Sequence, residues 1–488
     1  MKRSLLFRHR DFALAWVGGL ISMIGGWALW IALPLHVYQV SGSAFATSGV
    51  VVALVVPGIV LGSVAGVFVD RWNRRTTLVV GNLLLALATV PLLAVGESRL
   101  WLVYPAVFVL EVIEQFTGPA ENAFLPRLVG EHDLVEANSL NALNNNLARL
   151  GGPALGGALY AAGGLGGVVI VDAVTFVVAA ALLGAIRTSG AVAAAAEAAA
   201  TDAARRWRRV AREWREGLVV VRRSRAVGVV FGVTALTSFG EGVFAVMFAV
   251  WVHDVLHGGV PQLGWLQSSQ AVGGLLGGLV GAHVGKRFAP ERLYGFGLLA
   301  FGVFDLALFN YPLVLDGVWI GTALMVLVGI PSVSSRAGRD TILQTHVEDA
   351  FRGRVFGSLG TSSSLLLLVG TTAAGVLGGL LGPIALLNFQ GGAYVVAGLF
   401  VLLVLAPGLG HGARDERAEL GEEAGVDRVG EGVLAEEQAR AGRLHASAGL
   451  PPELDGDHGV VGAVPDRERE AGEIREVELE AVDAGHEA

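Results

Sequence analysis

The feature that most constrains this chain is a series of twelve apolar stretches, each about 20 residues long. An α-helix needs about that length to cross roughly 30 Å of hydrocarbon. We expect every stretch to be a helix, because a backbone inside lipid must satisfy its own polar groups, and because the short alternating strands of a barrel are missing. The predicted spans are 12–37, 45–69, 76–96, 101–123, 139–162, 166–186, 227–252, 263–284, 293–313, 317–337, 355–380 and 383–406.

The composition agrees with a membrane protein. Of the 488 residues, 53% are apolar and 16% are charged, whereas about a quarter of an ordinary soluble protein is charged. The chain has no cysteine, which excludes a disulfide framework, a thiolate metal site and a cysteine nucleophile. It has no Walker sequence, zinc-ligand pair, nucleophile elbow or nucleic-acid motif. We therefore expect a protein that is not an enzyme and that uses no metal, cofactor or ATP.

The basic residues predict the orientation and the domain organisation. They gather in the N-terminus and in every second loop, whereas the alternate loops hold only Arg99. The positive-inside rule then places both termini in the cytoplasm. We expect the membrane to be a bacterial plasma (inner) membrane. We expect a six-helix bundle over 1–188, a linker over 189–225 with a basic amphipathic helix, a second six-helix bundle over 226–407, and a disordered acidic tail over 408–488.

Two motifs and an internal repeat carry a family resemblance. The loop after the second span reads Gly66-Val-Phe-Val-Asp70-Arg71-Trp-Asn73-Arg74-Arg75, and the fifth span holds Arg149-Leu-Gly-Gly152-Pro153-Ala-Leu-Gly156-Gly157. The chain resembles the major facilitator superfamily of secondary transporters, in the twelve-span drug-exporter branch that includes macrolide and siderophore exporters. The resemblance covers about residues 5–407. It implies an all-α integral membrane fold, with 12 transmembrane helices in two pseudo-symmetric halves.

The resemblance implies a cytoplasmic gate at the first motif, formed by Gly66, Asp70, Arg71 and Arg74. Gly66 would let a neighbouring helix approach closely, and Asp70 would pair with arginine or face a helix N-terminus. Asn73 stands where the family usually has glycine. We expect it to adopt the left-handed backbone that Asn tolerates best after Gly. The alternative is a solvated loop rich in basic residues.

The second motif, with Gly152, Pro153, Gly156 and Gly157, is similar to the signature of exporters within the superfamily. Its small residues permit tight helix packing, and the proline bends the helix. The alternative is the general small-residue packing that many spans of this glycine-rich chain would show.

The fourth span carries a polar stripe of Glu111, Glu114, Gln115, Gly118 and Asn122, spaced along one helical face. A carboxylate at that depth must face a water-filled cavity or bind a proton. We therefore predict Glu111 and Glu114 as proton-coupling residues, and Gln115 and Asn122 as substrate-cavity residues. The alternative is a structural hydrogen bond to a neighbouring span. The span also lacks the cavity arginine that many antiporters of the superfamily carry there.

Charges and tryptophans in other spans complete the predicted site. Glu241 in the seventh span is a candidate for both proton coupling and substrate contact, and Arg149 is a cavity residue with Glu114 as its expected partner. Trp27 and Trp30 would offer an apolar wall to a bulky substrate, although plain packing is the alternative. The resemblance places two further acids on spans outside the cavity, as packing or loop-edge residues: Asp172 and Asp305.

The predicted function is export of amphipathic organic molecules, such as drugs, macrolides or siderophores, by proton-coupled alternating access. The expected partners are a small-molecule substrate, protons and membrane lipids, with no nucleic acid, and the protein is expected to be a monomer. One alternative keeps the fold but makes it a lipid or lysophospholipid flippase, or an uncoupled facilitator. The other is a membrane scaffold or sensor that transports nothing and whose acidic tail binds a partner.

Overall fold

The computed structural model describes residues 4–191, 212, 214, 221, 224–284 and 287–405. These residues are helical almost throughout and contain no strand, which confirms the predicted all-α membrane fold. The predicted acidic tail, 408–488, and most of the predicted linker with its amphipathic helix lie outside the described residues.

The described helices follow one another with short connections. In chain order they are α1 (Leu5–Arg8), α2 (Arg10–Ser41), α3 (Ala44–Val69), α4 (Arg74–Thr89), η1 (Val90–Ala94), η2 (Glu97–Leu102), α5 (Val103–Val129), η3 (Glu131–Asp133), α6 (Leu134–Gly184), α8 (Arg225–Asp254), α9 (Val260–Val284), α10 (Pro290–Asn310), η5 (Tyr311–Leu313), α11 (Val318–His346) and α12 (Asp349–Val404).

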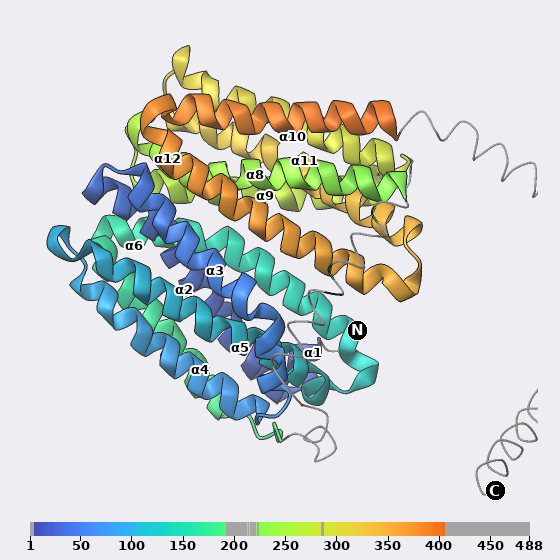
Figure 1. The fold of residues 1–488 in the computed structure, drawn as a ribbon. Helices are drawn as coiled ribbons and strands as arrows, with labels where there is room; N and C mark the ends of the chain where they lie inside the picture. Colours follow the sequence, from blue (N-terminus) through green and yellow to red (C-terminus); the bar gives the residue numbers. More distant parts are fainter. Residues whose placement is uncertain are drawn as a thin grey trace, which may run out of the picture. The chain divides into compact units, whose positions relative to one another are not determined.

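Two of these helices are pairs of rods joined at a glycine. α6 breaks at Gly163 and Gly164, and α12 breaks at Gly382, which has a φ of 73° and is followed by Pro383. Figure 1 shows the two orange rods of α12 meeting at a sharp turn. Of the described helices, nine are long and apolar enough to cross a membrane when each broken helix is counted once. The count of twelve crossings stays a prediction.

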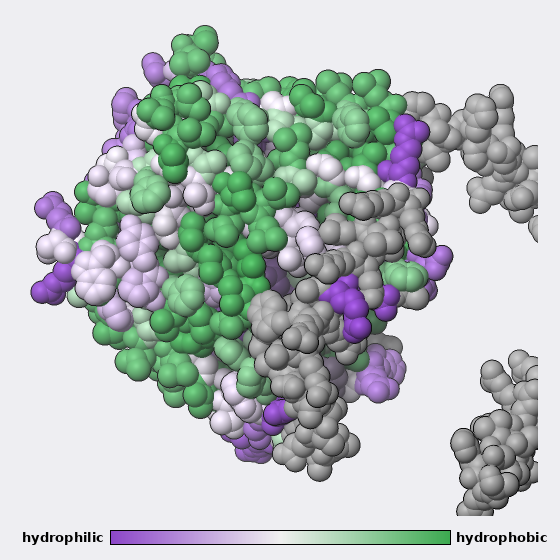
Figure 2. All heavy atoms as spheres, in the orientation of Figure 1, coloured by the Kyte–Doolittle hydropathy of each residue, from purple (hydrophilic) through white to green (hydrophobic). Residues whose placement is uncertain are grey.

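Apolar side chains cover much of the surface. Leu87 on α4, Trp319 on α11 and Leu380 on α12 are 66%, 75% and 80% exposed. Figure 2 shows hydrophobic residues across the visible face, with the strongly hydrophilic ones toward its edges. Such a surface is stable in lipid, whereas in water it would drive aggregation.

The helices pack mainly within two groups, here called the first half (residues 4–191) and the second half (224–405). In the first half α2 packs on α6, α3 on α5, and α4 on both α5 and α6. In the second half α8 and α10 pack on α12, and α11 packs on α9 and α10. The pairs α6–α9 and α3–α12 make most of the contact between the halves.

Contacts between the halves gather toward one end of the helices. The end at which α2 starts is called the N-terminal end here, and the opposite end, where these contacts lie, is called the far end. The Tyr38 hydroxyl near the end of α2 donates to Asp254 Oδ2 at the end of α8, over 2.5 Å. A Cβ added to Gly378 of α12 would lie 2.9 Å from the Cβ of Ala44, the first residue of α3. The far end is therefore closed in this conformation.

Candidate functional site

A cavity of about 540 Å³ lies between the halves and is called the central cavity here. Helices α2, α3 and α6 of the first half and α8 to α12 of the second half form its wall. This volume is within the usual range for small-molecule sites. The ionisable and amide side chains at the wall include Arg149, Glu241, Gln270, Asp305, Arg336, Gln390 and Tyr394.

The two acids of the central cavity are held by side chains of α12. The Tyr394 hydroxyl donates to Glu241 Oε1, and Gln390 Nε2 donates to Asp305 Oδ2 over 2.8 Å. Asp305 is only 2% exposed and Glu241 is partly buried. Acids at membrane depth are costly unless they are hydrogen-bonded or face a cavity, and these two meet both conditions.

Arg149 joins the halves at the wall of the central cavity. Its Nη2 donates to Gln270 Oε1 of α9 over 3.4 Å, and its electrostatic neighbours are Arg336 and Glu241. The expected pairing with Glu114 is wrong, because Arg149 bonds to Gln270 and its charged neighbours are Arg336 and Glu241, while Glu114 lines the wall of a different cavity. Glu241 and Arg149 thus lie at one wall, and their roles stay predictions.

A second cavity, of about 440 Å³, lies inside the first half between α2, α4, α5 and α6 and is called the first-half cavity here. Its wall includes Glu111 and Glu114, the two proton-coupling candidates. Trp27 and Trp30 line both cavities, and their rings meet edge to face with centroids 5.3 Å apart. The tryptophan pair is therefore shared between the two cavities.

The face of α5 toward the first-half cavity differs from the predicted stripe. It carries Glu111, Glu114, Gly118 and Glu121, whose spacing follows the helical period. Gln115 instead lies beside α3, where its Oε1 would be 3.5 Å from a Cβ on Gly62, and Asn122 is exposed outside the lining of both cavities.

Sequence reasoning did not place three of the acids at the cavity walls. Glu121 lies seven residues after Glu114, so helical periodicity could have found it. Asp172 and Asp305 were expected to pack away from any cavity. The structure buries both, at 1% and 2% exposure, but places Asp172 at the first-half cavity and Asp305 at the central cavity.

The predicted gate lies at the N-terminal end, where α3 ends and α4 begins. Asn73 caps α4: its side chain accepts from the Thr76 backbone N–H over 3.1 Å, at a φ of −63°. The expected left-handed backbone is therefore wrong, because the turn is closed by helix capping. The close approach expected at Gly66 is also missing in this conformation, since no described atom of a neighbouring helix lies within 4 Å of a Cβ placed there.

The charged residues of this segment differ in their surroundings. Asp70 and Arg71 are exposed, and the Arg74 backbone N–H donates to the Gly190 carbonyl over 3.0 Å. The neighbouring Arg75 donates to the Leu183 carbonyl over 3.3 Å and also to the Gly184 carbonyl. These bonds fasten the start of α4 to the end of α6, within the first half.

The second motif packs α6 tightly against two neighbours. A Cβ on Gly156 would lie 2.7 Å from the Ala28 carbonyl oxygen of α2, and one on Gly152 would meet Trp27. On the other side, a Cβ on Gly157 would lie 2.8 Å from Pro261 Cα of α9. Small residues are required here because backbone approaches backbone.

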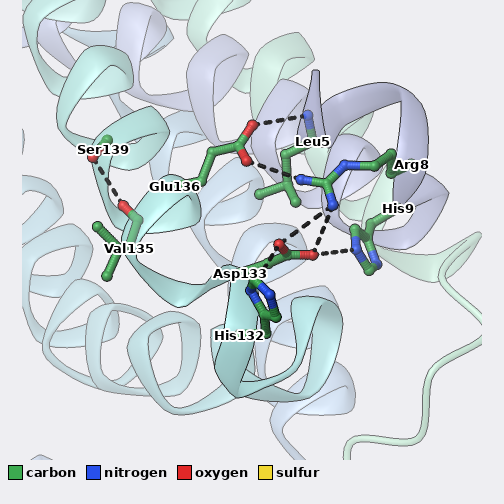
Figure 3. Close-up of polar contacts among 8 residues, drawn as sticks. All are labelled: Leu5, Arg8, His9, His132, Asp133, Val135, Glu136 and Ser139. Atoms are coloured by element: carbon green, nitrogen blue, oxygen red, sulfur yellow. Dashed lines mark hydrogen bonds and ion pairs between the residues drawn. The ribbon is translucent and has the colours of Figure 1, made fainter. Parts of the chain in front are cut away.

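A polar cluster at the N-terminal end ties α1 to the start of α6 (Figure 3). Arg8 Nη2 lies 2.9 Å from Glu136 Oε2 and its Nη1 lies 3.3 Å from Asp133 Oδ2. His9 Nε2 lies 3.0 Å from the same Asp133 oxygen, and the Leu5 backbone N–H donates to Glu136 Oε1 over 3.1 Å. The acids after the fourth span thus pair with the N-terminal segment of the same half.

This chain is similar in sequence to one known family and to known exporters. The family described as "Transmembrane secretion effector" matches residues 5–417. Macrolide efflux protein A of Streptococcus pyogenes is 26% identical over 364 residues, covering 74% of this chain and 87% of the relative. The enterobactin exporter EntS of Citrobacter koseri is 24% identical over 421 residues, covering 82% and 93%.

Comparison with solved structures gives the same fold. A bacterial homologue of the iron transporter ferroportin, in an inward-facing state, aligns with a TM-score of 0.64 at 16% identity. The alignment covers 82% of this chain and 99% of that one.

Proposed function

Because this chain belongs to the transmembrane secretion effector family of the major facilitator superfamily, we propose that it exports amphipathic organic molecules by proton-coupled alternating access. Family membership establishes a multi-pass membrane transporter rather than an enzyme. The exported class, the coupling to protons and the orientation in the membrane are the proposed parts.

The observation that carries the proposal is the central cavity between two halves that touch toward the far end. We propose that the basic N-terminal end faces the cytoplasm, as the positive-inside rule predicts. The closed far end is then the outer gate, and this conformation loads substrate from inside. Closing the N-terminal end and opening the far end would release the substrate outside.

The proposed substrate class rests on the relatives and on the cavity walls. The relatives are a macrolide efflux protein and an enterobactin exporter. The central cavity combines aromatic surfaces, such as Trp27, Trp30 and Phe244, with the amides of Gln267 and Gln270. Such a wall suits a bulky molecule with apolar faces and a few polar groups.

The proposed proton-coupling residues are Glu111 and Glu114 in the first-half cavity and Glu241 in the central cavity. Each is a carboxyl group at a cavity wall, where it can exchange protons. Glu241 also accepts from Tyr394 and interacts with Arg149. A proton on Glu241 would remove the negative charge that both neighbours face and would loosen α8 from α12.

The gate at the N-terminal end is proposed to consist of Gly66, Asp70, Arg71 and Arg74. Asp70 and Arg71 are exposed in this conformation, in which the far end is the closed one. When the N-terminal ends of the two halves approach each other, Asp70 would pair with an arginine of the second half or contact one of its helix N-termini.

The test is transport of a macrolide into vesicles that contain the purified protein. An acidic lumen should drive macrolide accumulation, and Glu114→Gln should abolish it. Glu97→Gln is the matched control, because Glu97 is exposed in η2 and lines neither cavity. Accumulation at the same rate without a gradient would indicate an uncoupled facilitator. Absence of macrolide transport under any gradient would contradict the proposal.

A further inference from the structure

The first-half cavity has an unusual balance of charge. Four carboxyl groups, from Glu111, Glu114, Glu121 and Asp172, lie at its wall. None of the described residues that line it is a lysine, arginine or histidine. The central cavity, in contrast, has Arg149 and Arg336 beside its acids. The negative charge of the first-half cavity is therefore not compensated by the wall itself.

This uncompensated negative charge affects Asp172 most, because Asp172 is the most buried of the four acids. It is 1% exposed, and neither carboxylate oxygen has a hydrogen-bond partner among the described residues. The nearby Thr175 hydroxyl, which has one proton, donates to the Asp172 backbone carbonyl over 2.7 Å. A Cβ on Gly25 of α2 would lie 2.6 Å from Asp172 Oδ1, so the carboxyl group lies directly against the α2 backbone.

The charged neighbour of Asp172 on the facing helix makes this burial less favourable. Glu114 of α5 interacts with Asp172 electrostatically, and it has the same sign. A buried carboxylate without a partner is strongly destabilising, so either a proton or a cation must neutralise it. A positive charge bound next to Asp172 would therefore be stabilising.

The shape of the cavity indicates which kind of cation fits. The described residues contain no set of three metal-ligating side chains close enough to hold a metal ion. Glu111 and Glu121 are separated by about 15 Å of helix, at 1.5 Å per residue. Most of the remaining wall is apolar and aromatic, with Trp27, Phe124 and Phe176, and its uncharged polar side chains are Ser22, Asn82, Thr117 and Asn141. Aromatic faces attract organic cations, and about 440 Å³ accommodates a small organic molecule.

We propose that the first-half cavity binds an amphipathic organic cation, with Asp172 as its counter-charge and the tryptophan pair as its apolar wall. This inference rests on the proposed function, since it places the exported molecule in the first-half cavity, next to the tryptophan pair shared with the central cavity, and assigns it a positive charge. It selects cations over anions of the same size and shape.

Equilibrium binding to the purified full-length protein tests the inference without any gradient. The probes are tetraphenylphosphonium and tetraphenylborate, which match in size and differ in the sign of the charge. Tetraphenylphosphonium should bind, tetraphenylborate should not compete, and Asp172→Asn should weaken cation binding at least about tenfold, or about 1.4 kcal/mol. Glu97→Gln, outside the cavity, should keep wild-type affinity.

Thermal unfolding of the same samples shows whether each variant is folded. Asp172→Asn is nearly isosteric and removes an unpartnered charge, so its unfolding temperature should not fall. If Asp172→Asn does not fold, the affinity for tetraphenylphosphonium is measured on Glu114→Gln instead, because Glu114 is exposed to the cavity. Equal binding of the two ions, or wild-type affinity in the folded Asp172→Asn variant, would overturn the inference.

The outcomes separate this inference from the proposed function. Proton-driven macrolide transport without cation binding would leave the proposed function standing and refute the cation site. Selective cation binding without gradient-driven transport of any substrate would support the site and refute proton-coupled export.

Discussion

One methyl group in the second motif tests the packing that joins α6 to α2. In a Gly156→Ala variant the new Cβ would lie 2.7 Å from the Ala28 carbonyl oxygen, 2.8 Å from its Cα and 3.1 Å from its carbonyl carbon. Carbon atoms in contact are normally about 3.5–4.0 Å apart. All three neighbours are backbone atoms, so no side chain can rotate away and the two helices must separate by up to about 1 Å.

The magnitude follows from two opposing effects. Overpacking of this kind costs about 1–3 kcal/mol, while alanine in place of glycine favours a helix by about 1 kcal/mol. Gly151→Ala provides the matched control on the same helix, because no described atom beyond its own stretch of helix backbone lies within 4 Å of its new Cβ. Both variants gain the helix preference, so the difference between them isolates the steric cost of about 1–3 kcal/mol.

Thermal unfolding of the purified protein in detergent measures this difference. Gly156→Ala should unfold at a lower temperature than the wild type, whereas Gly151→Ala should unfold at the same or a higher temperature. Equal stability of the two variants would refute the reasoning, because it would mean that α2 and α6 are not in backbone contact at Gly156.

Two further predictions concern contacts at opposite ends of the molecule. Tyr38→Phe removes the hydrogen bond to Asp254 across the far end, worth about 1 kcal/mol. Reaction of an Ala245→Cys residue, at the central cavity, with a membrane-impermeant thiol reagent from the far side should then be about fivefold faster; an unchanged rate would show that this bond does not hold the far end. Asp11→Asn weakens three hydrogen bonds, from the Arg187 and Thr188 backbone N–H groups and the Thr188 hydroxyl, and should cost about 1–2 kcal/mol of unfolding free energy in thermal or denaturant unfolding. A stability equal to that of the wild type would show that these three hydrogen bonds do not stabilise the protein.

Much of the fold could be predicted from the sequence because lipid imposes simple rules. Hydrophobic length alone located the helices, and the break in α6 falls at Gly163 and Gly164, between two predicted spans. Gly164 has a φ of 61°, a conformation that glycine adopts without steric cost. The second break, at Gly382, also falls between two predicted spans.

The walls of the cavities were harder to predict, because they depend on how each helix is rotated about its axis. The predicted stripe on α5 includes Gln115 and Asn122, whereas the face that lines the first-half cavity lacks both and includes Glu121. A single helix cannot show which of its polar edges meets a cavity and which meets α3. The division into two cavities, with Trp27 and Trp30 between them, also depends on tertiary packing.

Some local details followed a different physical rule from the expected one. Asn73 could have satisfied the turn by a left-handed backbone or by capping the next helix, and both are properties of Asn. The structure uses the cap. Asp172 was expected to pack because of the helix that carries it, and it does pack, but with its carboxyl group unsatisfied beside a cavity.

Closure and reopening of the far end is the central claim, and a reversible crosslink tests it most directly. The chain has no cysteine of its own, so an Ala44→Cys/Gly378→Cys variant carries a single reactive pair. The two Cβ positions are 2.9 Å apart, and a disulfide needs about 3.8 Å, so a shift of about 1 Å suffices. We predict that oxidation of this pair stops transport and that a reductant restores it, while each single variant is unaffected by oxidation. Transport at an undiminished rate by the fully oxidised pair would contradict alternating access through the far end.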